Sequence, residues 1–368
     1  MKVVFSASTS WYPYNFRLNT LKAFLKMGCK VYVVAPKDEY SSRYEGIGVS
    51  YIEVKIDRGG VNPISDLGSI ISYFNIYTSV KPDYIFNFTP KCNIYSTIVG
   101  RIFTKNIINN MSGLGAGLSK KNLVYYCSLS LYYFSQNLAR KVFFQNKSDL
   151  DFMVNKGIVK AEKCELIPGS GVDLERFQFS VKDSKQVTFI FSGRLLYPKG
   201  VGLFYEAARK LKREFGDKVN FSILGFVDEK AVNSVSKMVL ADWVKSGNID
   251  YLGATDDVVP YLRSASCIVL PSYYAEGVPK SLLEAAASGL PIITTDSVGC
   301  RETVEHNVNG FLCEPKSLDS LILCMRNFVN LSNDQRMAFG IRSREKVEKE
   351  FDETIVIQKY LRVINEGC

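Results

Sequence analysis

The 368-residue chain has a single histidine, His306, and none of its nine cysteines belongs to a Cys-x-x-Cys pair. A structural zinc site is therefore not expected. Scattered cysteines that are odd in number are typical of reduced, cytosolic proteins. The sequence does not open with the charged, apolar and small-residue zones of a signal peptide. We expect a protein that is not exported across a membrane.

Acidic residues are missing from a long stretch of the N-terminal half, because no Asp or Glu stands between Asp83 and Asp149. The net charge is +9, and all of the positive excess lies in residues 1–163. Residues 123–134 of this stretch form an aromatic-rich apolar run, shorter than the ~20 residues that span a bilayer. The basic residues of the stretch are Lys91, Arg101, Lys105, Lys120, Lys121, Arg140, Lys141 and Lys147.

Three interpretations of this basic, aromatic segment stay open. Residues 120–141 suit the surface of an anionic membrane, where each nearby cation contributes about 1 kcal/mol. This interpretation predicts a peripheral protein at the inner face of the cytoplasmic membrane. A core helix with solvated basic ends would have the same pattern. Nucleic-acid binding is disfavoured because no stacking or groove-reading motif accompanies the charge.

Short apolar runs alternate with helical patterns along the chain, which is typical of parallel sheets with helices on both faces. The chain is too long for one core to be expected. We predict an α/β protein with an N-terminal domain, a linker, a C-terminal domain and a last helix, at 1–166, 167–184, 185–350 and 351–368. The predicted strands are 3–6, 31–35, 50–54, 84–88, 105–109, 142–145, 187–191, 219–224, 249–252, 267–270 and 291–295, and the first and last helices are 16–27 and 353–365.

Ligands of open parallel sheets bind at the carboxyl ends of the strands, so functional residues are expected just after strands. After the strand at 187–191, Gly193 is followed by Arg194, whose planar fork of donors suits a diphosphate. Lys199 adds a compact positive charge in the same loop. A Gly-Arg turn after a strand is common, and this pair of cations is weak evidence when taken alone.

A second group of candidates follows the strand at 267–270. Pro279 suits the first turn of a helix, so backbone N–H groups near Gly277 and Val278 would face an anion or a hydroxyl group. Glu276 stands in the loop and Glu284 about one turn inside the helix, where two carboxylates would bind hydroxyls along an extended sugar nucleotide. The simpler alternatives are a helix-surface glutamate and a residue favoured by the helix dipole.

Together these stretches resemble the donor domain of the GT4 family of retaining glycosyltransferases, and Glu276 to Glu284 reproduces its E-x7-E pattern. The similarity covers nearly the whole chain. It implies the GT-B fold, which has two Rossmann-like, doubly wound parallel-sheet domains facing a cleft, and a last helix that crosses back to the N-terminal domain. It places Arg194 and Lys199 on the donor diphosphate, Glu276 on the sugar and Glu284 on the ribose. The implied donor-binding set is Gly193, Arg194, Lys199, Glu276, Gly277, Val278, Pro279 and Glu284.

The resemblance also implies a UDP-sugar donor with no metal and no other cofactor. Positioned cations and helix N-termini stabilise the leaving diphosphate, which makes a divalent cation unnecessary. Asp256 and Asp257 are a pair of carboxylates that a metal would suit. They stand just before the helix-like run 258–262, however, so helix capping is the simpler interpretation.

A narrower similarity concerns the acceptor. Residues 88–91 and 112–115 look like the subgroup that extends undecaprenyl-diphosphate-linked saccharides for O-antigen, capsule or protein glycosylation. Residues 298–302 are similar to bacterial α-1,3-N-acetylgalactosaminyltransferases. The acceptor candidates are Arg17, Lys91, Gly113 and Gly115, with plain surface cations as the alternative for the first two.

Many GT4 members have a histidine in the N-terminal domain, close to the transferred sugar. The matching region here, 109–115, has none, and His306 is expected in a surface turn. The transferred sugar is expected to be GalNAc or another hexose or N-acetylhexosamine. Two other functions stay open: a UDP-sugar epimerase, which would need acid and base groups that the N-terminal half lacks, and a non-catalytic sugar-nucleotide-binding membrane scaffold, which the missing histidine favours.

Overall fold

The computed structural model describes residues 1–57, 63–114, 123–180, 186–229, 231, 233–274 and 277–366. The chain divides into two compact units. The first contains Met1–Ser170 and Thr354–Cys368, and the second contains Gly171–Glu353. The chain first passes from one unit to the other between Ser170 and Gly171, inside the predicted linker 167–184. Val172 and Phe177 of that segment, however, lie in the core of the second unit.

The first unit is built on a seven-stranded sheet in the order β3-β2-β1-β4-β5-β6-β7. Its paired strands are parallel, and the central ones are buried on both faces, which explains their continuous apolar runs. The strands are β1 (Lys2–Ser6), β2 (Lys30–Ala35), β3 (Ser50–Glu53), β4 (Tyr84–Asn87), β5 (Ile107–Met111), β6 (Lys141–Phe144) and β7 (Cys164–Leu166).

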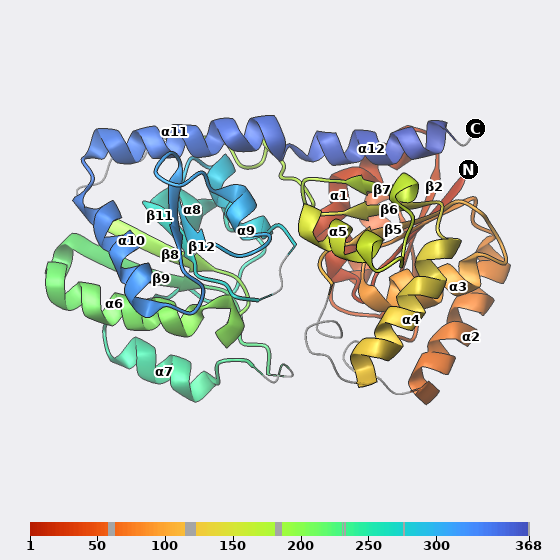
Figure 1. Ribbon diagram of the computed structural model, residues 1–368, viewed down its shortest axis with the longest axis horizontal. Coiled ribbons are helices and arrows are strands. Elements are labelled where there is room, and N and C mark those ends of the chain that lie inside the picture. Colours follow the sequence, from red (N-terminus) through yellow and green to blue (C-terminus); the bar gives the residue numbers. More distant parts are fainter. Residues whose placement is uncertain are drawn as a thin grey trace. The chain divides into compact units, whose positions relative to one another are not determined.

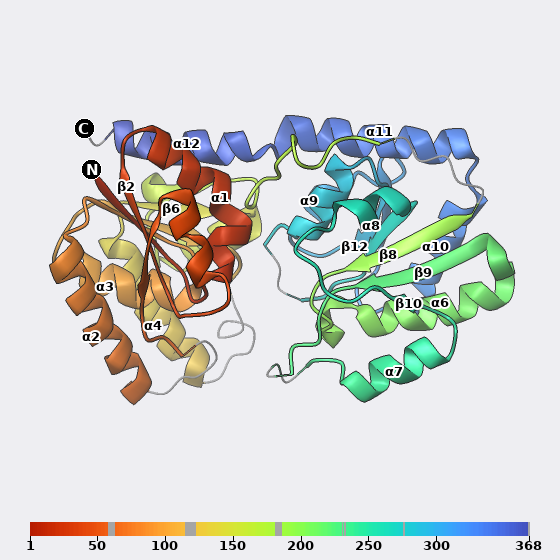
Figure 2. The same cartoon turned by 180° about the vertical axis from the view of Figure 1, so that it is seen from behind.

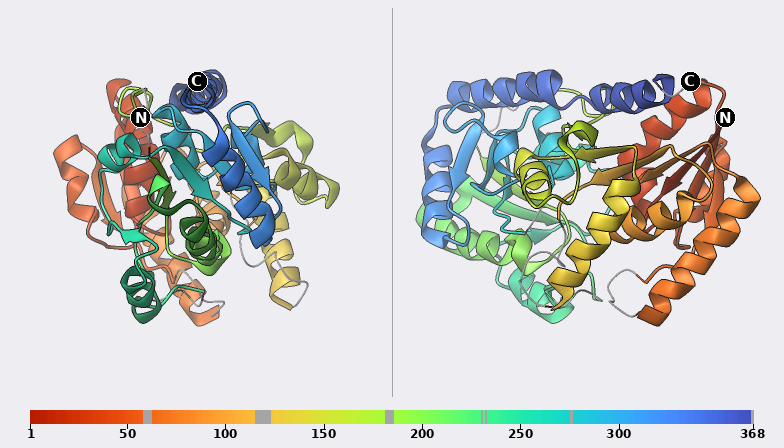
Figure 3. Two further views of the ribbon diagram at one scale, coloured as in Figure 1. Left: turned by 90° about the vertical axis from the view of Figure 1, so that its left-hand side faces the viewer. Right: turned by 45° about the vertical axis from the view of Figure 1, so that its right-hand side comes forward.

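Helices cover both faces of this sheet (Figures 1 and 2). On one face, α1 (Trp11–Lys26) and α12 (Glu353–Asn365) share a core with the sheet. On the other face lie α2 (Pro63–Val80), α3 (Thr97–Gly100), α4 (Leu123–Leu138) and α5 (Lys147–Asn155). Figure 3 shows the orange α2 and yellow α4 across the sheet from the blue α12. No helix in the described part of the chain is long and apolar enough to cross a membrane.

Helix α1 begins at Trp11, whereas the sequence pattern predicted a start at residue 16. Its N-terminus is capped from a distance. The Asp38 carboxylate accepts the backbone N–H groups of Ser10 at 3.0 Å and Trp11 at 3.1 Å. A carboxylate at a helix N-terminus satisfies free N–H groups and is favoured by the helix dipole. Because this cap comes from the loop after β2, the local sequence around residue 11 does not reveal it.

The second unit is built on a six-stranded sheet in the order β10-β9-β8-β11-β12-β13, with parallel pairing. Helices α6 and α10 pack together, and α9 packs with α11 (Figure 1). The strands are β8 (Val187–Ser192), β9 (Val219–Leu224), β10 (Asp250–Tyr251), β11 (Cys267–Leu270), β12 (Ile292–Thr295) and β13 (Gly310–Cys313). The helices are α6 (Val201–Phe215), α7 (Lys237–Lys245), α8 (Val259–Ser264), α9 (Lys280–Ala287), α10 (Leu318–Asn330) and α11 (Asn333–Glu350).

Both sheets are doubly wound. In the first, the strand order reverses between β1 and β4, and in the second between β8 and β11. Ligands of such sheets bind in the crevice at this switch point, outside the carboxyl ends of the two central strands. The topology therefore directs attention to the loops that follow β8 and β11.

Candidate active site after β8 and β11

The loop after β8 carries the two predicted phosphate-binding cations. Gly193 has a φ of +152°, which favours glycine, and its N–H donates to Leu224 O at 3.0 Å. A Cβ atom on Gly193 would be 3.9 Å from Lys199 Cδ, so the Lys199 stem runs close to this turn. Arg194 is 42% exposed, and its Nη1 atom lies 3.6 Å from Asp228 Oδ2. The structure thus places both cations in one short loop at the switch point.

This loop is fastened to the loop after β11. The N–H of Tyr273 donates to Pro198 O at 2.9 Å. Gly200 has a φ of +82°, and a Cβ atom there would lie only 2.2 Å from Pro271 O. The hydroxyl of Thr295, at the end of β12, donates to Ser272 O. Three strand ends therefore form one rigid platform under the predicted donor site.

The predicted helix follows directly. Helix α9 starts at Lys280, with Pro279 as its N-cap residue rather than in its first turn. Pro279 O accepts the N–H of Leu282 at 3.1 Å. Gly277 and Val278 are buried just before the helix. The predicted sugar-binding residue, Glu276, lies outside the described residues.

Glu284 projects from the middle of α9 and is partly buried. Burial raises the pKa of its carboxyl group, and the nearby Lys280 and Arg176 cations lower it. Within the described part of the chain its carboxylate makes no hydrogen bond or ion pair. Even partial burial of a carboxylate without donors is unfavourable, so this group is suited to accept hydroxyl donors from a ligand.

Two charged residues near these groups were not predicted from the sequence. Asp228, in the loop after β9, faces Arg194. Arg176 donates to Asp256 O at 2.9 Å, and its Nη2 atom lies 3.7 Å from Asp257 Oδ1. The position of Asp228 after the buried strand β9 could have identified it as a candidate from the sequence. Arg176 follows no strand, and the sequence gives no sign of it.

The N-cap residue of α8 is Val258, so neither Asp256 nor Asp257 is the N-cap, but Asp257 contacts the first turn of the helix. Its Oδ1 atom accepts the N–H of Val259, the first residue of α8, at 3.3 Å. Among the described residues, no group of three or more histidine, cysteine, aspartate or glutamate side chains is arranged to hold a metal ion. His306 lies in an exposed turn, as predicted, and its Nδ1 atom accepts the N–H of Leu312 at 3.0 Å.

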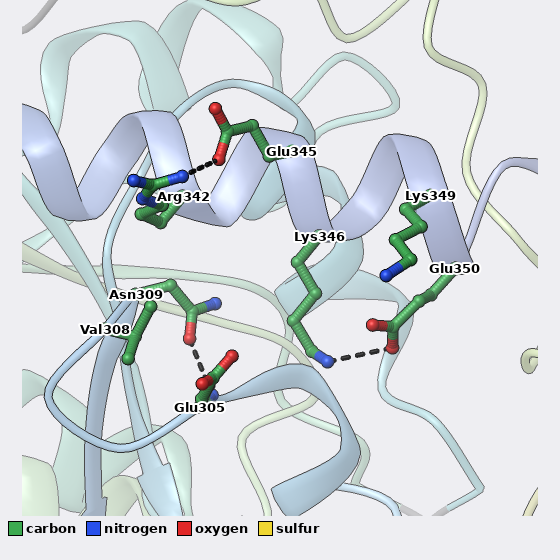
Figure 4. A pocket seen from close by; sticks show the side chains of 8 residues that line it. All are labelled: Glu305, Val308, Asn309, Arg342, Glu345, Lys346, Lys349 and Glu350. Carbon is green, nitrogen blue, oxygen red and sulfur yellow. Dashed lines mark hydrogen bonds and ion pairs between the residues drawn. The ribbon is translucent and has the colours of Figure 1, made fainter.

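A pocket of about 370 Å³ in the second unit contains none of the predicted donor residues. It lies beside α11, and ion pairs link its side chains (Figure 4). One pair is Arg342 with Glu345 at 2.7 Å, and another is Lys346 with Glu350 at 2.8 Å. Because these charges already compensate each other, the pocket lacks the excess positive charge that a diphosphate requires.

The acceptor candidates of the first unit differ from expectation. Arg17 is not a surface cation, because it is only 1% exposed and stacks between the rings of Phe88 and Tyr360, with its Cζ atom 5.2 and 5.7 Å from their centroids. Its Nη1 atom donates to Ser170 O at 3.1 Å, whereas Nε and Nη2 are buried without a partner. The guanidinium group therefore lies inside the unit and offers no exposed donors.

Lys91 forms an ion pair with Asp66 of α2, with Nζ 2.7 Å from Oδ1, and both side chains are less than one-fifth exposed. This interaction was not predicted. Gly113, just after β5, has a φ of +119°, which favours glycine. Gly115 lies outside the described residues.

The first three residues of the region that matches the family's histidine, 109–111, are buried, whereas 112–114 are partly buried. Asn110 is 1% exposed and accepts the hydroxyl of Tyr360 at 2.5 Å. Its Nδ2 atom donates to Asn87 O at 3.0 Å. Asn109 takes part in the same network, since its Nδ2 atom donates to Gln136 Oε1 at 3.0 Å. These amides connect β4, β5, α4 and α12.

The outer face of α4 is apolar and exposed. The exposed fractions are 79% for Leu123, 59% for Tyr126, 54% for Tyr133 and 67% for Phe134. The opposite face, which includes Tyr132, is buried in the core. The prediction of a core helix is therefore correct for the inner face of α4, whereas the outer face is exposed. Helix α2, which like α4 packs against α3, has further exposed apolar side chains, namely Leu67, Ile71 and Phe74. Lys120 and Lys121 lie outside the described residues.

The chain is similar to known glycosyltransferases. Residues 173–346 match the family model Glycosyl transferases group 1. The chain is 28% identical to the N,N'-diacetylbacillosaminyl-diphospho-undecaprenol alpha-1,3-N-acetylgalactosaminyltransferase of Campylobacter jejuni, over 99% of this chain and 98% of that one. It is 26% identical to the UDP-Gal:alpha-D-GlcNAc-diphosphoundecaprenol alpha-1,3-galactosyltransferase of Escherichia coli, over 71% and 70%.

Among solved structures, the Anabaena HepE protein in complex with UDP is similar over 100% of both chains, with a TM-score of 0.80 and 15% identity. This similarity concerns the fold alone, and it confirms the predicted pair of Rossmann-like units. The group 1 domain covers the switch point of the second sheet together with Arg194, Lys199 and α9. Residues 173–346 thus form a domain of the glycosyl transferases group 1 family, and the chain is a glycosyltransferase with the GT-B fold.

Proposed function

We propose that this glycosyltransferase moves a sugar from a UDP-sugar to an undecaprenyl-diphosphate-linked saccharide, with retention at the anomeric carbon, in the assembly of a bacterial surface polysaccharide. The observation that carries the donor half of this proposal is the grouping of Arg194, Lys199 and the start of α9 at one topological switch point. The acceptor half rests on the two named relatives, both of which act on diphospho-undecaprenol-linked saccharides.

The site suits the chemistry of the leaving group. When the anomeric C–O bond breaks, negative charge develops on the diphosphate, and fixed positive groups stabilise it. Arg194 would bind two phosphate oxygens, Lys199 would neutralise a third, and the dipole of α9 would add a partial positive charge. Loss of one such preorganised donor costs roughly 2.7–4 kcal/mol in other enzymes. We therefore propose a reaction that needs no resident metal or cofactor.

In the proposed front-face reaction, the acceptor hydroxyl attacks on the side from which UDP departs. The new glycosidic bond forms as the bond to the phosphate oxygen breaks, and the hydroxyl proton passes to that phosphate oxygen. No protein base is then required next to the sugar. Glu276 would bind the sugar, Glu284 the ribose hydroxyls, and backbone groups of Gly193, Gly277 and Val278 would line the donor.

The sugar is proposed to be GalNAc or another hexose or N-acetylhexosamine. Support comes from the names of the relatives, one of which transfers N-acetylgalactosamine and the other galactose. The acceptor contacts of Arg17, Lys91, Gly113 and Gly115 stay a prediction. The buried position of Arg17 favours an indirect role for that residue.

We further propose that the exposed apolar side chains of α2 and α4 bind the anionic lipid surface at the inner face of the cytoplasmic membrane. Exposed apolar patches of this kind mark interaction surfaces, and Tyr and Phe side chains suit the headgroup region. A flotation assay with neutral and phosphatidylglycerol-containing vesicles tests this. Binding is expected only to the anionic vesicles and is expected to be lost in Phe134→Glu, whereas equal recovery with both vesicles would contradict the electrostatic contribution.

The function is tested by turnover with a panel of UDP-sugars and a synthetic polyprenyl-diphosphate-GlcNAc acceptor, in EDTA. Transfer is expected for wild type and is expected to fall about 100-fold or more in Arg194→Ala and Glu276→Ala. Arg209→Ala is the matched control, because Arg209 is similarly exposed, at 40%, and pairs with Glu206 on the same unit. UDP binding without transfer to any acceptor would favour the scaffold, and conversion of the free UDP-sugar would favour the epimerase.

A further inference from the structure

The loop after β9 brings a negative charge to the predicted diphosphate site. Asp228 Oδ2 lies 3.6 Å from Arg194 Nη1, and the two side chains are 29% and 42% exposed. This distance is longer than a hydrogen bond, and a pair this exposed contributes little stability. The ion pair is therefore weak enough for the Arg194 guanidinium to turn from the Asp228 carboxylate to a stronger anion.

The backbone nevertheless holds Asp228 near Arg194. Gly225 has a φ of +150°, and a Cβ atom there would lie 1.8 Å from Gly193 O, so the loops after β8 and β9 are in direct contact. The N–H of Leu195 donates to Phe226 O at 3.0 Å. The chain on both sides of Arg194 is therefore attached to the β9 loop at Gly225 and Phe226, which keeps the backbone of this loop next to Arg194.

We propose that Asp228 is a positioning residue that weakens the binding of the nucleoside diphosphate and so promotes its release. Without donor, its carboxylate partly neutralises Arg194. With donor or product bound, the guanidinium turns to the diphosphate and the carboxylate stays close enough to repel it. This inference rests on the proposed function, because it requires the diphosphate to bind at Arg194.

The opposite role, a carboxylate that orients Arg194 and thereby strengthens binding, would need a short and well-shielded hydrogen bond. The separation of 3.6 Å and the exposure of both side chains do not provide one. The two roles predict opposite results when the charge of Asp228 is removed. UDP would bind more tightly if Asp228 repels it, and more weakly if Asp228 orients Arg194.

The test is calorimetric titration of the full chain with UDP. Asp228→Asn is expected to lower the Kd roughly three- to tenfold, the range expected for removing one partly screened like charge. The gain is expected to shrink as salt rises. The inhibition constant of UDP as a product is expected to fall in parallel, which a merely structural role would not produce.

Glu229→Gln is the matched control. Glu229 is in the same loop and is also acidic, but its carboxylate pairs with Lys237 Nζ at 2.7 Å instead of Arg194. Its substitution is expected to change the Kd less than about twofold. Equal tightening in both variants would overturn the proposal, because net charge rather than the position of Asp228 would then explain it.

Arg194→Ala separates the two possible failures. If UDP fails to bind wild type, or binds Arg194→Ala as tightly as wild type, the donor site is misplaced, and both the proposed function and this inference are overturned. If Arg194→Ala weakens binding and Asp228→Asn leaves it unchanged or weaker, only the role of Asp228 is overturned.

Discussion

The contact between Gly200 and Pro271 makes a quantitative prediction about the platform under the donor site. Gly200 has a φ of +82°, and an added Cβ atom would lie 2.2 Å from Pro271 O. Gly200→Ala therefore combines two penalties. The left-handed conformation costs about 1–2 kcal/mol for a residue with a Cβ atom, and forcing apart a packed contact adds about 1–3 kcal/mol.

Gly247 provides the matched control. Its φ of +70° is similar, but an added Cβ atom would meet no atom within 4 Å. Gly247→Ala is therefore expected to lose only the conformational part, about 1–2 kcal/mol. The difference between the two variants isolates the contact with Pro271.

The assay is urea unfolding followed by the fluorescence of Trp243, in a Trp11→Phe background. The chain has two tryptophans, and Trp243 is the one in the second unit, 9% exposed and stacked on Tyr205 at 4.6 Å. Unfolding of that unit is therefore observed on its own. Gly200→Ala is also expected to weaken UDP binding about tenfold, because the displaced loop carries Lys199. Equal unfolding free energies for Gly200→Ala and Gly247→Ala would refute the close approach of the two loops.

Two further predictions concern buried charges. Because burial raises the pKa of Glu284, the folded state is stabilised below the pKa of the unfolded chain, and this stabilisation is lost as pH rises through the folded-state pKa. Glu284→Gln is thus expected to raise the urea concentration at the midpoint of unfolding at neutral pH and to remove this pH dependence of stability. It is also expected to weaken UDP binding about tenfold, because a hydrogen-bond acceptor for the ribose is lost. A lowered midpoint would contradict the argument. Arg17→Met is expected to change the free energy of unfolding by less than about 1 kcal/mol by circular dichroism, because two of the guanidinium nitrogens are buried without partners; a loss above about 3 kcal/mol would show that Arg17 stabilises its unit.

Most strands could be predicted from the sequence, because a parallel strand that is buried on both faces is written as a continuous apolar run. The last helix, 353–365, was placed at the bounds that the structure has. Two strands were missed. β7 (Cys164–Leu166) is a short, partly exposed strand at the edge of its sheet, without a long apolar run. β13 begins at Gly310, and the pair Asn309-Gly310 resembles a turn signal in the sequence. Gly310 is nevertheless required in the strand, because a Cβ atom there would lie 1.9 Å from Ile292 O.

The site was predictable where its residues follow strands within a recognisable pattern. Arg194 and Lys199 lie in the loop after β8, and Glu284 lies on α9, which follows β11 in the chain. Their roles in donor binding stay a prediction. Tertiary partners were not predictable. Nothing around Lys91 indicates that Asp66 pairs with it, and nothing around Arg17 indicates that Phe88 and Tyr360 enclose it. Such contacts depend on packing between segments that are distant in the sequence.

Asn110, near the carboxyl end of β5, lies in the region 109–115 that matches the family's histidine. Asn110 is fixed between the hydroxyl of Tyr360 on α12 and the carbonyl oxygen of Asn87 on β4. Asn110 is only 1% exposed, so its side chain is buried together with these two partners. The position thus stabilises the fold by attaching the C-terminal helix to the first sheet. Under the proposed mechanism, transition-state stabilisation falls to the leaving-group side, on Arg194 and Lys199. Substitutions there should lower kcat more than a substitution of Asn110 that leaves the first unit folded.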